Sequence, residues 1–94
     1  MKTQRHFEIA SEKTRREVAQ IRTMIVDLER AVQILSSDIA IEEKCSRVPY
    51  PSDPAYSIFA RTLTARRDNL TVTIATLEQR LEKILVALPE AIAA

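Results

Sequence analysis

Apolar residues recur along this chain at alternating steps of four and three positions, in two long segments of roughly residues 4–45 and 54–88. This spacing is the heptad repeat, lettered a to g with apolar residues at a and d, and it predicts helices that pair as a coiled coil. In the first segment the residues at these steps are Phe7, Ser11, Thr14, Val18, Ile21, Ile25, Leu28, Val32, Leu35 and Ile39. In the second segment they are Tyr56, Ala60, Leu63, Arg67, Leu70, Ile74, Leu77, Leu81, Ile84 and Leu88.

The stretch between the two segments is rich in proline. Residues 47–56, RVPYPSDPAY, contain three of the four prolines, and the chain has no glycine. Proline cannot continue a helix, and it biases the residue before it away from helical geometry. We therefore expect a stiff corner in which Asp53 caps the second helix and Pro54 occupies its first position. Pro89 marks the expected end of that helix.

These signals predict an all-α fold, an antiparallel two-helix coiled-coil hairpin that forms a single domain over residues 1–94. Helix one is expected over about residues 4–45, the proline-rich turn over 46–53, helix two over about 54–88 and a short tail over 89–94. If the turn centres near Pro51, facing residues have numbers that add to about 102, so that Ile39 faces Leu63. A register slipped by one heptad, with a sum near 95, also pairs apolar layers.

Composition narrows the class of protein. The formal net charge is +1, so nothing points to a nucleic-acid partner. No apolar run approaches the ~18 residues of a membrane-spanning helix, and the N-terminus lacks the apolar core of a secretory signal peptide. The single cysteine, Cys45, excludes an internal disulfide. We expect a protein of the reducing cytoplasm.

The sequence offers no set of residues with the spacing of a catalytic, cofactor or metal site. His6 has no second ligand residue at a suitable spacing, and Cys45 has no paired base. The adjacent Glu42 and Glu43 are expected to be solvated. A phosphate-binding loop requires glycine, which is absent. We therefore expect no enzyme, with no catalytic residues, no cofactor and no metal.

A second, weaker apolar stripe lies beside the first seam. It consists of Met24, Ala31, Ile34 and Ile41, and apolar residues on the outside of a coiled coil suggest that another helix packs there. Scattered surface aliphatics are also normal. Arg67 occupies an a position, where we expect its long side chain to reach out of the seam to a carboxylate or to contact a partner near the sequence ARRDNL.

Three stretches carry a resemblance to a known family. EKTRREVAQIRTMIVDLER in helix one, the corner YPSDPAY and ARRDNL in helix two are similar to the FliJ family of flagellar type III export proteins, in its alphaproteobacterial form. The resemblance covers residues 7 to about 82. Usual members continue into a longer second helix, so the chain resembles a C-terminally short member.

The resemblance implies a non-enzymatic helical hairpin of the flagellar export apparatus. FliJ-type proteins associate with the hexameric export ATPase and the membrane export gate, and they help to hand over export chaperones. The matched segments imply contacts to these partners through Arg16, Gln20, Met24, Asp27, Arg66, Asp68, Asn69 and Thr73. The alternative is an adaptor or regulator that self-associates through the Met24, Ala31, Ile34 and Ile41 stripe as a helical-bundle homodimer.

Overall fold

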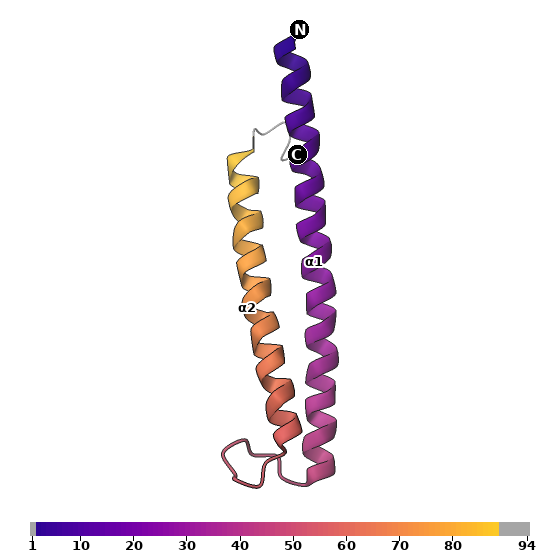
Figure 1. Ribbon diagram of the computed structural model, residues 1–94, viewed down its shortest axis with the longest axis vertical. Helices are drawn as coiled ribbons and strands as arrows, with labels where there is room; N and C mark the ends of the chain where they lie inside the picture. Colours follow the sequence, from indigo (N-terminus) through magenta and orange to yellow (C-terminus); the bar gives the residue numbers. More distant parts are fainter. Residues whose placement is uncertain (1, 89–94) are drawn as a thin grey trace.

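The computed structural model describes residues 2–88, with side chains described from Ser11 onward. Two helices, α1 (Lys2–Ser46) and α2 (Ile58–Ala87), lie antiparallel along a rod of 69 × 18 × 17 Å (Figure 1). The expected all-α hairpin is confirmed. The expectations for His6, Phe7 and Pro89 fall outside the described side chains. Over the described residues, neither helix has a stretch long and apolar enough to cross a bilayer.

The apolar seam forms as the heptads predict. Every expected seam residue from Ser11 to Leu88 is buried or half-buried. Leu35, Ile39 and Leu63 form one hydrophobic cluster, and Leu70 packs against it. Aliphatic side chains at these positions interlock between the helices and withdraw apolar surface from water, which is the main favourable term in such a rod. The buried positions are Val18, Ile21, Ile25, Leu35 and Ile39 on α1 and Tyr56, Ala60 and Leu63 at the corner and the start of α2.

Helix α2 begins at Ile58, four residues later than expected, so the assignment of Asp53 as its N-cap is wrong. Ser57 is the cap, and its Oγ accepts a hydrogen bond from the Ala60 N–H at 3.1 Å. This bond satisfies one of the backbone donors that the first helical turn leaves unpaired.

The Asp53 side chain serves the corner itself. Its Oδ1 accepts from the Ala55 N–H at 2.8 Å, and its carbonyl accepts from the Tyr56 N–H at 3.0 Å. These two bonds close a local turn around Pro54, the residue that we expected at the first position of the helix. An aspartate that bonds the backbone two residues on is a common turn device, and here it competes successfully with helix capping.

Two side-chain hydrogen bonds fasten the corner to the last turns of α1. The Tyr56 hydroxyl donates to Glu43 Oε2 at 2.9 Å, and the Ser57 hydroxyl donates to Glu42 Oε1 at 2.8 Å. Both glutamates are half-buried, so the expectation that they are simply solvated is wrong. Bonds to a charged carboxylate are stronger than neutral ones, and this pair fixes where α2 begins relative to α1.

The Tyr56 ring is the aromatic anchor of the corner. The residue is 4% exposed, and the Arg61 guanidinium lies 5.3 Å from its ring centre while donating to the Pro51 carbonyl at 3.1 Å. Burial, together with the hydrogen bond and negative charge of Glu43, raises the pKa of Tyr56 above its usual value of 10.0. The Arg61 cation acts in the opposite direction.

Cross-helix contacts report the alignment of the two helices. The pairs Glu43 with Tyr56 and Glu42 with Ser57 have numbers that add to 99, and Glu17 with Arg80 adds to 97. These sums lie between the two expected registers of 102 and 95. The reason is that α1 extends past the level at which α2 begins (Figure 1), so that Tyr56 and Ser57 meet Glu43 and Glu42 in the last turns of α1.

Helix α1 ends in a left-handed residue that is not glycine. Arg47 has φ 61°, a conformation that costs roughly 1–2 kcal/mol for a residue with a Cβ. The neighbouring Ser46 stabilises this end, because its hydroxyl donates to the Glu43 carbonyl at 3.1 Å and accepts from the Val48 N–H at 3.4 Å. At the other end of the hairpin, α2 stops at Ala87, and Leu88 is extended, as expected for a residue before proline.

Replacing Arg47 by glycine should stabilise the hairpin. Glycine adopts the left-handed conformation without the Cβ penalty, so we expect Arg47→Gly to raise the free energy of unfolding by about 1 kcal/mol. Arg47→Ala is the matched control, because alanine retains the Cβ and should leave stability nearly unchanged. Urea denaturation followed by circular dichroism measures both. An equal effect of the two variants would contradict the strain at this position.

The raised pKa of Tyr56 predicts alkaline instability. Because its pKa is higher in the folded than in the unfolded chain, the stabilisation is fully present below pH 10 and is lost as pH rises through the folded pKa. In a Tyr50→Phe background, where Tyr56 is the only tyrosine, the phenolate absorbance should titrate with a midpoint above 10. Adding Glu43→Gln should lower that midpoint, and an unchanged midpoint would contradict the assigned contact.

Candidate functional site

The second apolar stripe of α1 is exposed, as the sequence predicts. Met24, Ile34 and Ile41 are 49%, 57% and 60% exposed, and Ala31 is half-buried. Met24 and Ala31 directly precede a residues of the seam and therefore occupy g positions, while Ile34 and Ile41 occupy the neighbouring c positions. The four side chains consequently follow one side of the rod over about five turns of α1.

A contact between the helices shows which side of α2 adjoins this stripe. Arg80 Nη2 donates to Glu17 Oε1 at 2.7 Å, and both residues directly precede an a residue in their own helix. The g positions of the two helices therefore lie on the same side of the seam. On α2 these positions also include Phe59, Arg66 and Thr73, so they flank the apolar stripe of α1.

We call the surface formed by the g and c positions of both helices the composite face. Its apolar members are Met24, Ala31, Ile34 and Ile41 on α1 and Phe59 on α2, and Phe59 is 60% exposed. Both helices contribute polar members. Nine of the twelve residues predicted as partner contacts lie on this one face: Gln20, Met24, Asp27, Ala31, Ile34, Ile41, Arg66, Asn69 and Thr73.

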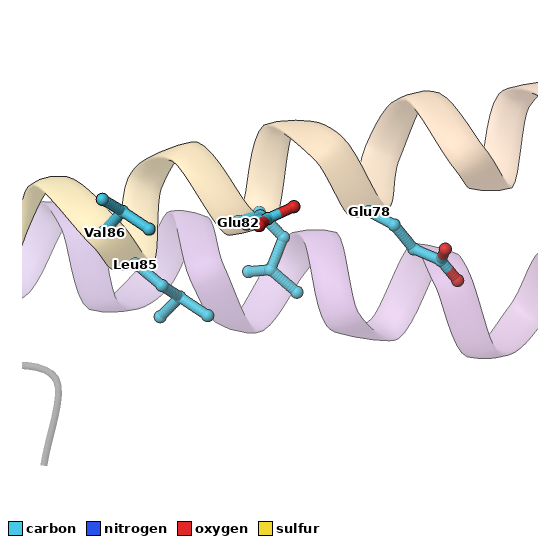
Figure 2. Close-up of a pocket in the computed structure, with 5 residues that line it drawn as sticks. Glu78, Glu82, Leu85 and Val86 are labelled. Carbon is cyan, nitrogen blue, oxygen red and sulfur yellow. The ribbon is translucent and has the colours of Figure 1, made fainter.

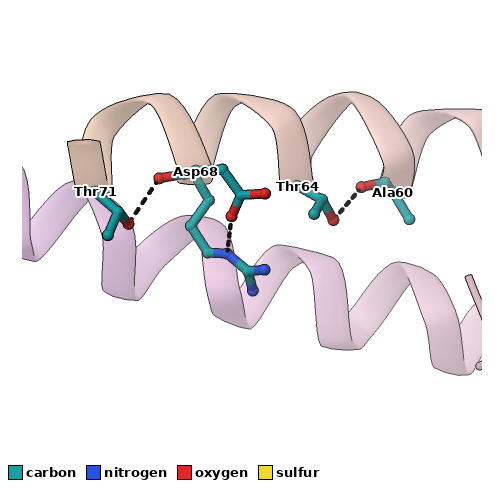
Figure 3. A network of polar contacts seen from close by, with 5 residues as sticks. Ala60, Thr64, Asp68 and Thr71 are labelled. Carbon is teal, nitrogen blue, oxygen red and sulfur yellow. Dashed lines mark hydrogen bonds and ion pairs between the residues drawn. The ribbon is translucent and has the colours of Figure 1, made fainter. Parts of the chain in front are cut away.

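The other three predicted contacts lie elsewhere. Arg16 is on the outward side of α1, where it pairs with Glu12 at 3.9 Å. Arg67 is in the seam with 34% of its side chain exposed, and its Nε lies 3.5 Å from Asp68 Oδ1 (Figure 3). Asp68 directly follows an a residue and so occupies a b position, which faces the opposite side of the rod from the g and c positions of the composite face. Arg67 therefore reaches out of the seam to a carboxylate, which was the first of the two expectations for this residue.

The threonines of α2 have their hydroxyl protons already engaged. Thr64 donates to the Ala60 carbonyl at 2.9 Å and Thr71 to the Arg67 carbonyl at 3.0 Å (Figure 3). On the composite face, Thr73 donates in the same way to the Asn69 carbonyl at 3.0 Å. Such back-bonding leaves only the oxygen lone pairs for a partner. Thr62 and Thr76 on this face also bond to the carbonyl four residues earlier.

Shallow hollows lie along both helices of the described rod. One, of about 520 Å³, lies on α1 beside the composite face and is lined by Ala19, Gln20, Thr23 and Met24. Another lies near the end of α2, where the carboxylates of Glu78 and Glu82 stand beside Leu85 and Val86 (Figure 2). Neither encloses a small molecule, and the first enlarges the surface that a partner could contact around Met24.

The described side chains of this surface include few reactive or metal-ligating groups. Among the described side chains, no three of His, Cys, Asp and Glu gather as a metal site. Cys45 is an exposed free thiol at the g position nearest the corner. What the composite face offers is a long, narrow contact surface on which the exposed aliphatic side chains of α1 stand among polar side chains of both helices, and such a surface suits another helix better than a small ligand.

Phe59 is the member of the face that sequence reasoning missed. Its position directly before Ala60 in the heptad pattern is the signal that would have found it, because that position adjoins the seam. Helix two was expected to begin five residues before Phe59, with Asp53 and Pro54 as its capping signals. The proline-rich stretch therefore predicted where the helix starts but not which way the Phe59 side chain points.

Replacing Arg67 should show that its charged side chain weakens the aliphatic seam in which it lies. Arg67→Leu places an aliphatic side chain in an aliphatic seam and should raise the free energy of unfolding by about 1 kcal/mol. The adjacent and exposed Arg66 provides the matched control, since Arg66→Leu should not raise stability. Thermal denaturation at low protein concentration measures both. A destabilised Arg67→Leu would contradict the placement of this residue in the seam.

No protein-family model, curated protein or solved structure matches this chain. A functional assignment therefore rests on its residues and on the geometry of the rod.

Proposed function

We propose that this chain is a non-enzymatic coiled-coil component of a flagellar type III protein export apparatus, which binds the export ATPase ring, the export gate and export chaperones. The support is the similarity of the sequence to the FliJ family in EKTRREVAQIRTMIVDLER, YPSDPAY and ARRDNL. In this proposal the protein is cytoplasmic and reaches the inner membrane only through its partners.

The single observation that carries the proposal is the composite face. Nine of the residues implied as partner contacts, either by the family resemblance or by the apolar stripe, gather on one side of the rod and not around it. Three of them, Met24, Ile34 and Ile41, are large aliphatic side chains that expose about half of their surface. An exposed line of this kind on a two-helix rod is typical of a surface that another protein covers.

The shape of the rod also suits a ring-shaped partner. A hairpin 69 Å long and less than 20 Å wide can enter the central opening of a hexamer with its corner or its open end leading. The rigid corner, fastened by Tyr56 and Ser57 to α1, keeps both helices parallel to the rod axis. The ring would then meet side chains of both helices at each level along the rod.

Binding to a purified export ATPase hexamer tests the proposal. We expect the wild-type chain to bind, and we expect a Met24→Glu/Ile34→Glu variant to bind at least tenfold more weakly, because each glutamate places a charge in the apolar stripe. Isothermal titration calorimetry measures both affinities.

The matched control is Val26→Glu/Val72→Glu, which places the same two charges at exposed aliphatic positions away from the composite face. This control should bind like the wild type. No binding by the wild-type chain, to the ATPase or to the export gate, would overturn the proposed function. Equal loss in the two double variants would remove the composite face from it.

A further inference from the structure

The free hairpin exposes more surface than a compact chain of its mass. Its accessible area is 7598 Å² at 10.7 kDa, whereas the scaling for folded monomers gives about 5,500 Å². The excess, about 2,000 Å², is more than the roughly 800 Å² per partner that a standard protein interface removes from water. A second copy of the chain could therefore cover one side of the rod and still leave ordinary surface elsewhere.

The charges on the composite face are divided between the two helices. On α1 the described part of the face carries Lys13, Asp27 and Asp38, and on α2 it carries Arg66 and Lys83. Among the described residues, none of these five takes part in an ion pair. Glu17 and Arg80 neutralise each other across the seam, so the remaining charges leave the α1 half net negative and the α2 half net positive.

Two copies can cover this face symmetrically in two ways, since a twofold interface places the same surface on both subunits. With the twofold axis along the rod, α1 of one copy lies over α2 of the other, and both corners are at the same end. With the axis across the rod, α1 lies over α1 and α2 over α2, and the corners are at opposite ends. The first arrangement places acidic against basic halves, whereas the second places like charges together, which is unfavourable.

We propose that the free chain forms a homodimer in which two composite faces pack as a four-helix bundle, with both proline corners at the same end. In this arrangement Phe59 lies level with Ile41 of the second copy, because residues at one height have numbers that add to about 99. By the same rule Lys83 lies level with Arg16 and next to Glu17 of the second copy. The apolar stripe is covered, and the charged residues alternate with it along the same g and c positions.

Cys45 reports the arrangement directly. It is exposed, and it lies near the corner at a g position on the side of the composite face. In the proposed dimer the two thiols stand at the same end, whereas in the alternative they stand near opposite ends of a rod 69 Å long. A short bis-maleimide added to the folded, full-length chain should therefore yield a covalent dimer on a denaturing gel, and Cys45→Ser should yield none.

Light scattering completes the test. The wild-type chain should have twice the mass of one chain, with a dissociation constant that Ile34→Glu/Ile41→Glu raises at least tenfold. The matched control Val26→Glu/Val72→Glu should remain dimeric and should still crosslink. A monomer at all concentrations would overturn the proposal, and so would a dimer that does not crosslink through Cys45.

Reversing the charges of one half of the composite face tests whether the α1 half of one copy meets the α2 half of the other. Asp27→Lys/Asp38→Lys makes both halves basic, and Arg66→Glu/Lys83→Glu makes both acidic, so each variant alone should dimerise at least tenfold more weakly. An equal mixture of the two should recover a mixed dimer, because each basic half then meets an acidic one. Failure of the mixture to associate would contradict the proposed contacts. These experiments need no other protein, so they stand or fall independently of the flagellar assignment.

Discussion

The aliphatic seam between α1 and α2 supports every other feature of this protein, because a two-helix rod has no other core. Among the described residues its buried side chains are few, and on the second half of the hairpin they are concentrated at the corner, in Tyr56, Ala60 and Leu63. Beyond Leu63 the seam residues of α2 are only half-buried, so the packing there leaves apolar area in contact with water. A fold with so little buried surface gains much from any partner that covers one of its sides.

The corner compensates for the absence of glycine. With no glycine in the chain, α1 ends on a strained Arg47, and the direction of the chain is then set by prolines and by the turn around Asp53. Hydrogen bonds from Tyr56 and Ser57 to two glutamates hold the returning chain against α1. This arrangement fixes the alignment of the helices, and the alignment in turn places Met24, Ile34 and Phe59 on one side.

The sequence was sufficient to predict the helices and the seam, since the heptad pattern depends only on the period of the α-helix. The heptad pattern does not predict that Ser57 caps α2 or that Glu42 and Glu43 are half-buried. They depend on contacts between residues that the corner brings together, and Asp53 followed by proline is an equally good capping signal. The register shares this difficulty, because sums of 102 and 95 both align apolar layers and the observed polar pairs lie between them.

The candidate site was predictable only in part, because the sequence does not show how the two helices are aligned. The period of the helix identified Ile34 and Ile41, but only the contact between Glu17 and Arg80 shows which side of α2 adjoins them. That contact also explains why Asp68 and Arg66, two residues apart in sequence, serve different sides of the rod. It reveals the division of charge between the halves of the face, which the sequence shows only once the two helices are aligned.

Both proposals use the composite face, so the dimer and the complex with an export component would exclude each other. The dimer requires that this face packs against the same face of a second copy and is not an ordinary solvated side. Small-angle X-ray scattering of the free chain measures whether it does. We expect particles of twice the mass of one chain with a maximum dimension close to the 69 Å of a single rod. Particles with the mass of one chain would contradict it.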